Sequence, residues 1–312
     1  MELVKRGIRP STRRTYKSIH NQYKSFCQWY GLCAVPAMQV TLLLYITSLN
    51  TKGITHSSIL VHLAAIRNLH VEMGFGDINM SCPQIKQAMK AVREAAPQAV
   101  TKSPIQLPLL IRMWAMLAGD EYKSMWRALL ALAFFGGLRG SEYTVATSKA
   151  AAAAPMIQNL QFVHEKGTMI MYYRVVQSKT NVHGMVIPYG CSGHDVCPVC
   201  SMKEYLDLRY KQGTVSKKEC LFVYKSMVVT KSRVDEKIKW LVERIGMRPR
   251  EYSTHSLRAG VASTAAQAGF KRLGGQKIGG WASQVYGTYI RDMNMHRAQF
   301  AKRLIRHATQ NN

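Results

Sequence analysis

The sequence predicts a mainly α-helical protein with one small β-sheet, divided into two domains. Apolar residues recur at helical spacing through much of the first hundred residues. Residues 169–189 (MIMYYRVVQSKTNVHGMVIPY) instead place β-branched and aromatic residues on both sides of a polar centre, which is typical of a β-hairpin. The length of 312 residues favours two domains over one.

The first domain is expected over residues 1–98 as a small helical unit. Its predicted helices cover residues 11–30, 39–50, 56–73 and 83–96. Along the first of them one helical face is formed by Tyr16, Ile19, Tyr23, Phe26 and Tyr30. Side chains at this spacing share one side of a helix, so we expect that side to pack on the other helices.

Basic residues occupy the remaining, exposed faces of the first predicted helix. They are Arg13, Arg14, Lys17 and Lys24. These side chains are candidates to contact the phosphates of DNA, although a single exposed charge is more often only solvated. A polar stretch follows, with a linker expected at residues 99–106. An extended basic linker would let two domains close around a duplex.

The second domain is expected over residues 107–312, with the small sheet near residues 160–190. The apolar run at residues 128–138 is too short to span a bilayer and predicts a buried helix. The predicted hairpin turns at residues 178–184. An alanine-rich interruption at residues 150–154 has no part in any catalytic argument.

The charge balance indicates a polyanionic partner. The chain has 43 lysine and arginine residues against 17 aspartate and glutamate residues, a formal net charge of +26. Nucleic acid is the default partner for such an excess on a folded protein. A membrane surface fits less well, because the basic residues are scattered along the chain. No signal peptide is visible at the N-terminus, so an intracellular location is expected.

One cysteine-rich segment has ligand types that zinc accepts. The segment CSGHDVCPVC contains Cys191, His194, Cys197 and Cys200. Four ligands within ten residues, with no second zinc-knuckle motif, form an irregular zinc site. A structural role without metal is therefore the favoured interpretation, and zinc is the alternative. The seven cysteines, an odd number, predict reduced thiols and not a disulfide framework.

Two arginines, a histidine and a tyrosine occur in an order that suits phosphodiester cleavage. Arg139 lies in GLRGSE, His255 and Arg258 lie in THSLRAG, and Tyr289 ends GGWASQVYGTY. Planar guanidiniums can meet the non-bridging oxygens of a five-coordinate phosphate bidentately. Their positive charge would also favour the phenolate of a tyrosine nucleophile. Such a set needs no metal.

The leaving 5′ oxygen needs a proton, and Lys179 in the predicted hairpin turn is suited to donate it. Each residue alone has an ordinary structural explanation. Arg139 could cap the end of a helix, His255 could be a satisfied half-buried histidine, and Trp281 could be core. These explanations leave the order of the residues and the basic chain unexplained, and so catalysis is favoured.

With these motifs the chain resembles the tyrosine recombinase (phage-integrase-like) family over its whole length. The residues that match the family's active site are Arg139, Glu142, Lys179, His255, Arg258, Trp281 and Tyr289. By this resemblance Glu142 is the acidic companion of Arg139, and Trp281 takes the family's His-or-Trp position. The resemblance implies a helical core-binding domain followed by a mixed α/β catalytic domain.

The position of the nucleophile leaves one alternative open. Trp281 and Tyr289 are eight residues apart, where nine is commoner in the family, so Tyr286 is a rival. Ile290 and Arg291 continue the family-like ending and favour Tyr289. The same ending resembles members encoded by eukaryotic mobile elements of the DIRS or Crypton kind, for which a nuclear location would follow.

The resemblance implies site-specific DNA strand exchange through a 3′-phosphotyrosyl intermediate. Because that link conserves the energy of each broken bond, no ATP, metal or other cofactor is implied. The expected partner is double-stranded DNA, bound by a homotetramer of two dimers, with a monomer possible off DNA. Phe300, Leu304 and Ile305 would lie on a terminal helix that couples protomers. The alternatives are a catalytically silent DNA-binding protein and a type IB topoisomerase-like enzyme.

Overall fold

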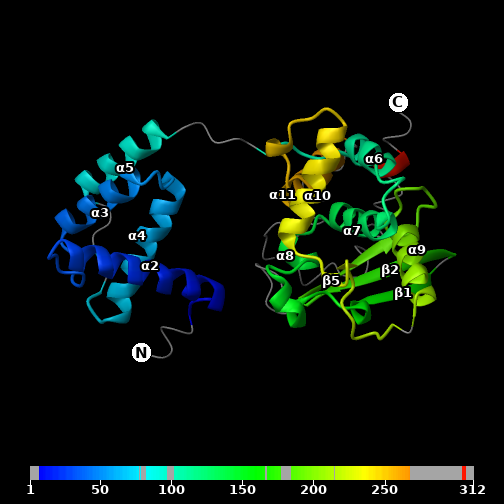
Figure 1. The fold of residues 1–312 in the computed structure, drawn as a ribbon, viewed down its shortest axis with the longest axis horizontal. Helices are drawn as coiled ribbons and strands as arrows, with labels where there is room; N and C mark the ends of the chain where they lie inside the picture. Colours follow the sequence, from blue (N-terminus) through cyan, green and yellow to red (C-terminus); the bar gives the residue numbers. More distant parts are fainter. Residues whose placement is uncertain are drawn as a thin grey trace. The chain divides into compact units, whose positions relative to one another are not determined.

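The computed structural model shows a mainly helical protein with two small sheets (Figure 1), which confirms the predicted fold class. Two compact units can be distinguished, Met1–Ala99 and Val100–Asn312. The structure describes residues 7–76, 78, 82–96, 102–165, 167–176, 184–213, 215–267 and 304–306.

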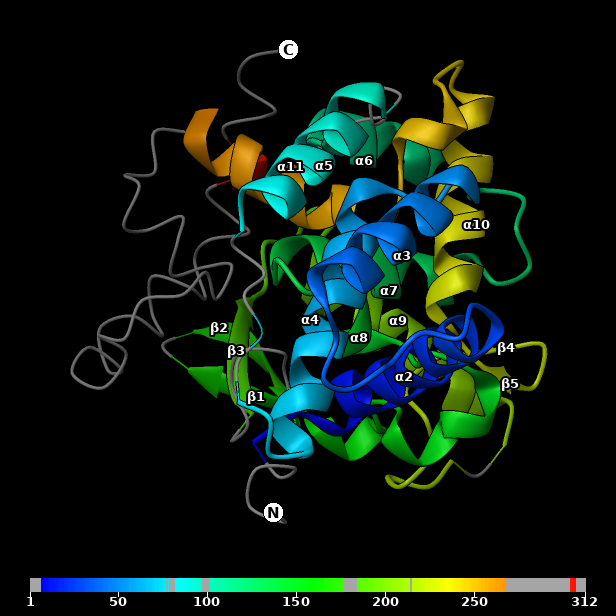
Figure 2. The same cartoon turned by 90° about the vertical axis from the view of Figure 1, so that its left-hand side faces the viewer.

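The first unit consists of helices at the positions that the sequence predicts. They are α2 (Pro10–Trp29), α3 (Gln39–Thr51), α4 (His56–Glu72) and α5 (Pro83–Ala95). Helix α2 packs against α4, and α3 packs against α5 (Figures 1 and 2). The rings of Tyr23 and Tyr45 meet edge to face at 5.1 Å in the core.

The prediction is wrong for one residue of the apolar face. Tyr30 is 61% exposed, because α2 ends at Trp29 and the chain turns away there. Cys27 is buried in its place, one helical turn after Tyr23. The basic residues Arg13, Arg14, Lys17 and Lys24 are exposed, as expected.

The second unit has short helices around one buried helix. The elements before the hairpin are α6 (Leu107–Ala115), α7 (Lys123–Phe135), α8 (Gly140–Tyr143), η1 (Ser148–Ala153) and η2 (Ile157–Asn159). After the hairpin follow α9 (Pro198–Lys211), α10 (Lys231–Arg244), η3 (Pro249–Glu251) and α11 (Thr254–Gln267). All residues of α7 from Ala128 to Phe135 are buried, which confirms the predicted buried helix.

The sheet of this unit confirms the strands of the predicted hairpin. Strands β1 (Leu160–Glu165), β2 (Thr168–Val175) and β3 (Met185–Gly190) pair antiparallel in this order. Val175 pairs with Met185, so these residues close the described part of the hairpin. Helix α9 packs against β2 and β3. A second small sheet pairs β4 (Val223–Tyr224) with β5 (Met227–Val228).

The segment that precedes α6 lies along α11. The Ile105 backbone N–H donates to the Ser256 carbonyl at 2.9 Å, and Leu107 N–H donates to Thr264 Oγ1 at 3.2 Å. Gly260 permits this approach, because a Cβ atom there would lie 1.7 Å from the Ile105 carbonyl oxygen. Lys102, within the stretch expected to be a linker, also contacts the second unit, where its Nζ donates to the Arg250 carbonyl.

The last described residues belong to the core of the second unit. Leu304 and Ile305 are buried with the core side chains of that unit. The structure thus places two of the three apolar tail residues against their own chain, and Phe300 lies outside the described residues.

Gly260→Ala should destabilise the second unit by about 1–3 kcal/mol, because the added methyl group overlaps backbone that cannot rotate away. Urea unfolding of the purified chain measures this loss. Gly119→Ala is the matched control, since a Cβ atom there meets nothing within 4 Å. Equal midpoints for both variants would contradict the close approach of α11 to Ile105.

Candidate active site

The turn before Arg139 closes α7 with a glycine. Gly137 adopts a φ of +57°, and its N–H donates to the Phe134 carbonyl at 2.9 Å. The next N–H, of Leu138, donates to the Ala133 carbonyl at 3.0 Å. These two bonds form a Schellman motif, which ends a helix and redirects the chain. Arg139 therefore leaves the buried helix at a defined position.

Glu142 holds Arg139 through its backbone and its side chain. Glu142 Oε2 accepts from the Arg139 backbone N–H at 2.8 Å, and Oε1 accepts from Arg139 Nη1 at 3.0 Å. The Glu142 side chain is fully buried, while that of Arg139 remains 23% exposed. A guanidinium fixed in this way loses little rotational freedom when it binds an anion.

Arg258 reaches the same place from α11. Its side chain is buried and its Nη1 donates to the Gly137 carbonyl, so the two arginine segments join here. Burial and the nearby positive charge of Arg139 lower the pKa of Arg258 to about 10, while Glu142 opposes that shift. Two guanidiniums thus face one carboxylate, and the excess positive charge suits a phosphate.

His255 begins the same helix as Arg258 but differs from it in burial. Its side chain is exposed near the N-terminus of α11, three positions before the buried Arg258. Ser256 Oγ accepts from the Ser253 N–H at 3.1 Å, which starts the helix at this point. The His255 side chain is accordingly accessible from solvent, and its contact with phosphate remains a prediction.

Asp235 and Lys231 support both arginine segments, and sequence reasoning missed them. Asp235 Oδ1 accepts from the Thr254 N–H at 2.6 Å, and its Oδ2 accepts from Lys231 Nζ at 2.6 Å. The stem of Lys231 packs on Gly140, where an added Cβ would lie 3.3 Å from Lys231 Cδ. The i,i+4 spacing is visible in the sequence, but the Thr254 contact, nineteen residues on, is not.

Two tyrosines anchor the hairpin strands to the arginine turn. Tyr173 of β2 donates to the Glu142 carbonyl at 2.6 Å, and Tyr189 of β3 donates to the Leu132 carbonyl at 3.0 Å. Burial, with a smaller contribution from Glu142, raises the pKa of Tyr173 above its ordinary value. The hydroxyl therefore remains a donor. These bonds fix the base of the hairpin relative to Arg139.

Four residues of the predicted site or its alternatives lie outside the described residues: Lys179, Trp281, Tyr286 and Tyr289. The described part of the chain brings together Arg139, Glu142 and Arg258, with His255 on the same helix as Arg258. The catalytic roles predicted for all of these residues remain predictions.

The thiols of Cys191, Cys197 and Cys200 also cluster, with their sulfur atoms within 4.8 Å of one another. His194, the fourth residue of the predicted zinc cluster, is not part of this described group.

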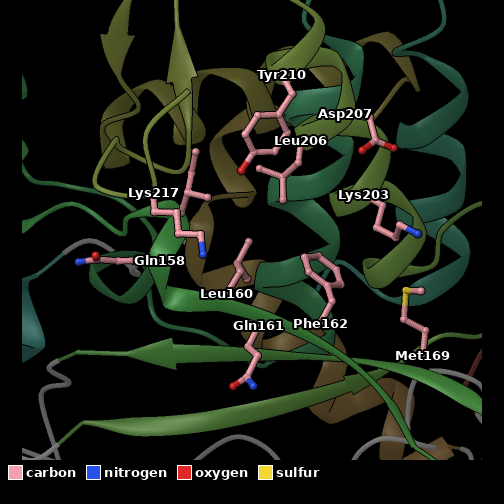
Figure 3. A pocket seen from close by; sticks show the side chains of 11 residues that line it. Gln158, Leu160, Gln161, Phe162, Met169, Lys203, Leu206, Asp207, Tyr210 and Lys217 are labelled. Atoms are coloured by element: carbon pink, nitrogen blue, oxygen red, sulfur yellow. The ribbon is translucent and has the colours of Figure 1, made fainter. Parts of the chain in front are cut away.

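A hollow in the second unit is separate from the arginines. Figure 3 shows it between β1 and α9, with Gln161 and Phe162 on one side and Lys203, Asp207 and Tyr210 on the other. Arg139, Glu142, His255 and Arg258 do not line it. The arginine cluster is thus not part of this concave pocket, although such a pocket is where sites for small molecules usually occur.

Comparisons with known proteins found similarity in sequence and in fold. No family model matches the chain. It is 25% identical over 270 residues to an integrase/recombinase XerD homolog of Selenomonas ruminantium, covering 82% of this chain and 74% of that protein.

Solved structures match across both units. The Tn1549 transposon integrase, in complex with transposon right end DNA, superposes with a TM-score of 0.58 at 14% identity, over 93% of this chain and 94% of that one. A lambda integrase dimer bound to a COC′ core site gives a TM-score of 0.55 at 17% identity, over 95% and 91%.

The fold is that of the core-binding and catalytic domains of tyrosine recombinases. The chain is therefore similar in fold to these integrases and similar in sequence to the integrase/recombinase XerD homolog. These similarities give no support to the narrower resemblance to DIRS or Crypton elements. In the part of the chain that the structure describes, no helix is long and apolar enough to cross a membrane.

Asp235→Asn should lower the free energy of unfolding by about 1–2 kcal/mol at pH 7, the difference between charged and neutral hydrogen bonds. Burial alone would raise the pKa of Asp235, but the bonds from Lys231 and Thr254 lower it below its ordinary value. Because the pKa of Asp235 is lower in the folded chain than in the unfolded chain, where it is about 3.9, the ionised carboxylate stabilises the folded state above that pH. The difference between wild type and variant should therefore shrink as pH falls below about 4.

Denaturant unfolding at several pH values measures that difference. Glu236→Gln is the control, because Glu236 is exposed and forms a salt bridge with the exposed Arg233. A pH-independent loss for Asp235→Asn would contradict the assigned charge interaction.

Proposed function

We propose that this protein catalyses site-specific DNA strand exchange through a 3′-phosphotyrosyl intermediate. The observation that carries the proposal is the cluster of Arg139, Glu142 and Arg258, in which two guanidiniums from distant segments meet beside one carboxylate. A phosphate that gains charge during in-line attack would be stabilised there.

The proposed reaction uses residues of this chain alone. The Tyr289 hydroxyl attacks the scissile phosphate and forms a phosphotyrosine with the 3′ end, while the P–O bond to the 5′ oxygen breaks. Lys179 gives the 5′ oxygen its proton, and His255 exchanges the proton of the nucleophile and hydrogen-bonds the phosphate. A 5′-hydroxyl from a partner strand then reverses the step and restores the tyrosine, so neither ATP nor a metal ion is required by this scheme.

Double-stranded DNA is the proposed partner. The solved relatives were captured with transposon end DNA and with a core site, the latter as a dimer. The net charge of +26 and the exposed basic residues of α2 supply phosphate contacts of the required sign. We extend the dimer to a tetramer of two dimers on paired sites. A DNA substrate places the activity inside the cell, in the nucleus of a eukaryotic host.

A catalytically silent DNA-binding protein is the alternative from another class. Such a protein needs phosphate contacts but gains nothing from a buried arginine paired with a second arginine, because burying a charge is costly. A topoisomerase-like enzyme would use the same chemistry without joining strands from two duplexes. Formation of a covalent adduct distinguishes the first alternative, and a four-stranded intermediate distinguishes the second.

Tyr289→Phe should abolish the covalent protein–DNA adduct, because the phenolic oxygen is the proposed nucleophile. The measurement uses nicked suicide duplexes from the ends of the protein's own element, or a random pool, and a denaturing gel without added metal. Tyr286→Phe is the matched control and should keep the adduct. Loss of the adduct in Tyr286→Phe alone would identify Tyr286 as the nucleophile. DNA binding without any adduct in wild type would favour the catalytically silent DNA-binding protein.

Arg258→Lys should reduce the rate of adduct formation by about 10²–10³-fold, the usual cost of one oxyanion donor, since an ammonium cannot reproduce the planar fork. Single-turnover cleavage on bound DNA measures the rate. Arg233→Lys is the control, as its guanidinium is exposed and pairs with Glu236. A rate close to wild type in Arg258→Lys would remove this arginine from the proposed chemistry.

Arg14→Ala combined with Lys17→Ala should weaken binding to all duplex sequences alike. Each phosphate contact removed should reduce the slope of log affinity against log salt by about 0.9. Gln22→Ala on the same helix is the uncharged control. An unchanged slope would show that this face of α2 does not bind phosphate.

A further inference from the structure

Three cysteine side chains from two elements of the second unit converge on one point. Cys191 directly follows β3, while Cys197 precedes α9 and Cys200 lies in its first turn. Cys191 Sγ lies 3.3 Å from Cys200 Sγ and 3.9 Å from Cys197 Sγ. All of these sulfur atoms lie within 4.8 Å of one another.

These separations fit a tetrahedral metal ion. Zinc binds thiolates at about 2.3 Å, which places two sulfur ligands of a tetrahedron about 3.8 Å apart. The observed distances of 3.3 and 3.9 Å lie on both sides of that value. A disulfide requires a sulfur–sulfur distance of about 2.0 Å, so these thiols are separated by the distances of metal ligands and not by that of a disulfide.

The backbone around the thiols is arranged to support negative charge. The Ser192 N–H donates to Cys197 Sγ at 3.2 Å, and Gly193 takes a φ of +71° that turns the chain at this place. The N-terminus of α9, which has Pro198 in its first turn, adds the positive end of a helix dipole beside Cys197 and Cys200. Such N–H donors and dipoles stabilise bound thiolates.

We propose that Cys191, Cys197 and Cys200 bind one Zn²⁺ ion, with His194 as the fourth ligand. His194 lies in the loop that joins Cys191 to Cys197, and its Nδ1 accepts from the Val196 N–H at 3.4 Å, a long bond. His194 is not among the side chains that cluster within 4.8 Å here, so its imidazole would have to leave the Val196 bond and move to complete the ligand set. Binding releases the thiol protons to solvent and changes no oxidation state.

The ion would have a structural role and take no part in strand exchange. It would tie the end of β3 to the start of α9, and α9 packs against α7, the helix that leads to Arg139. Closed four-ligand zinc sites contribute directly to folding free energy. The inference stands on sulfur geometry and is independent of the proposed recombinase activity.

The test is the zinc content of the full chain, purified under reducing conditions and dialysed against buffer without chelator, by inductively coupled plasma mass spectrometry. About one zinc ion per chain is expected, lost in Cys197→Ser and kept in Cys220→Ser, since Cys220 lies in the same unit but outside the cluster. Cobalt substitution provides a second readout that does not depend on stable folding of a variant. It should give thiolate charge-transfer and tetrahedral ligand-field bands.

His194→Ala should weaken zinc retention against a competing chelator, and chelation should lower the melting temperature of wild type but not of Cys197→Ser. A wild-type chain without zinc or cobalt binding, or equal zinc in Cys197→Ser and wild type, would overturn the site. A Cys191–Cys200 disulfide found by mass spectrometry in protein kept reduced would also overturn it. Unchanged retention in His194→Ala would overturn the assignment of the fourth ligand.

Discussion

The bond from the buried Arg258 guanidinium to the Gly137 carbonyl is the contact around which the second unit is organised. A buried guanidinium must find acceptors, because leaving its charge unpaired costs several kcal/mol. The Gly137 carbonyl is available because the Schellman turn directs the chain away from α7 at this residue. The same turn delivers Arg139 beside Arg258, so one backbone feature fixes both arginines.

The surrounding elements hold this arrangement in place from different directions. Glu142 neutralises part of the charge and also fixes the backbone of Arg139. Tyr173 attaches β2 to the Glu142 carbonyl, and Asp235 attaches α10 to the first turn of α11. The bonds of Tyr173 and Asp235 link segments 31 and 19 residues apart in sequence, which explains how a site assembled from short motifs can be rigid.

The sequence predicted much of this because periodicity and motif chemistry are local. Helices α2 to α5 follow from apolar spacing, and the strands of the hairpin follow from alternating β-branched and aromatic residues. Arg139, His255 and Arg258 were predicted because their residue types and order suit one reaction, and Glu142 was predicted from the family resemblance. The exposure of Tyr30 was not found, since periodicity predicts which residues share a face but not where the helix ends.

The sequence by itself determined the helical and hairpin segments, the excess of positive charge and the order of the residues predicted to contact a phosphate. Only the tertiary structure decided that Arg258 is buried against Gly137, that Asp235 holds the helix of His255, and that Cys191, Cys197 and Cys200 meet. The physical reason is that propensity and spacing act over a few residues. Burial, pairing of charges and convergence of sulfur atoms depend on packing between segments that the chain itself keeps far apart.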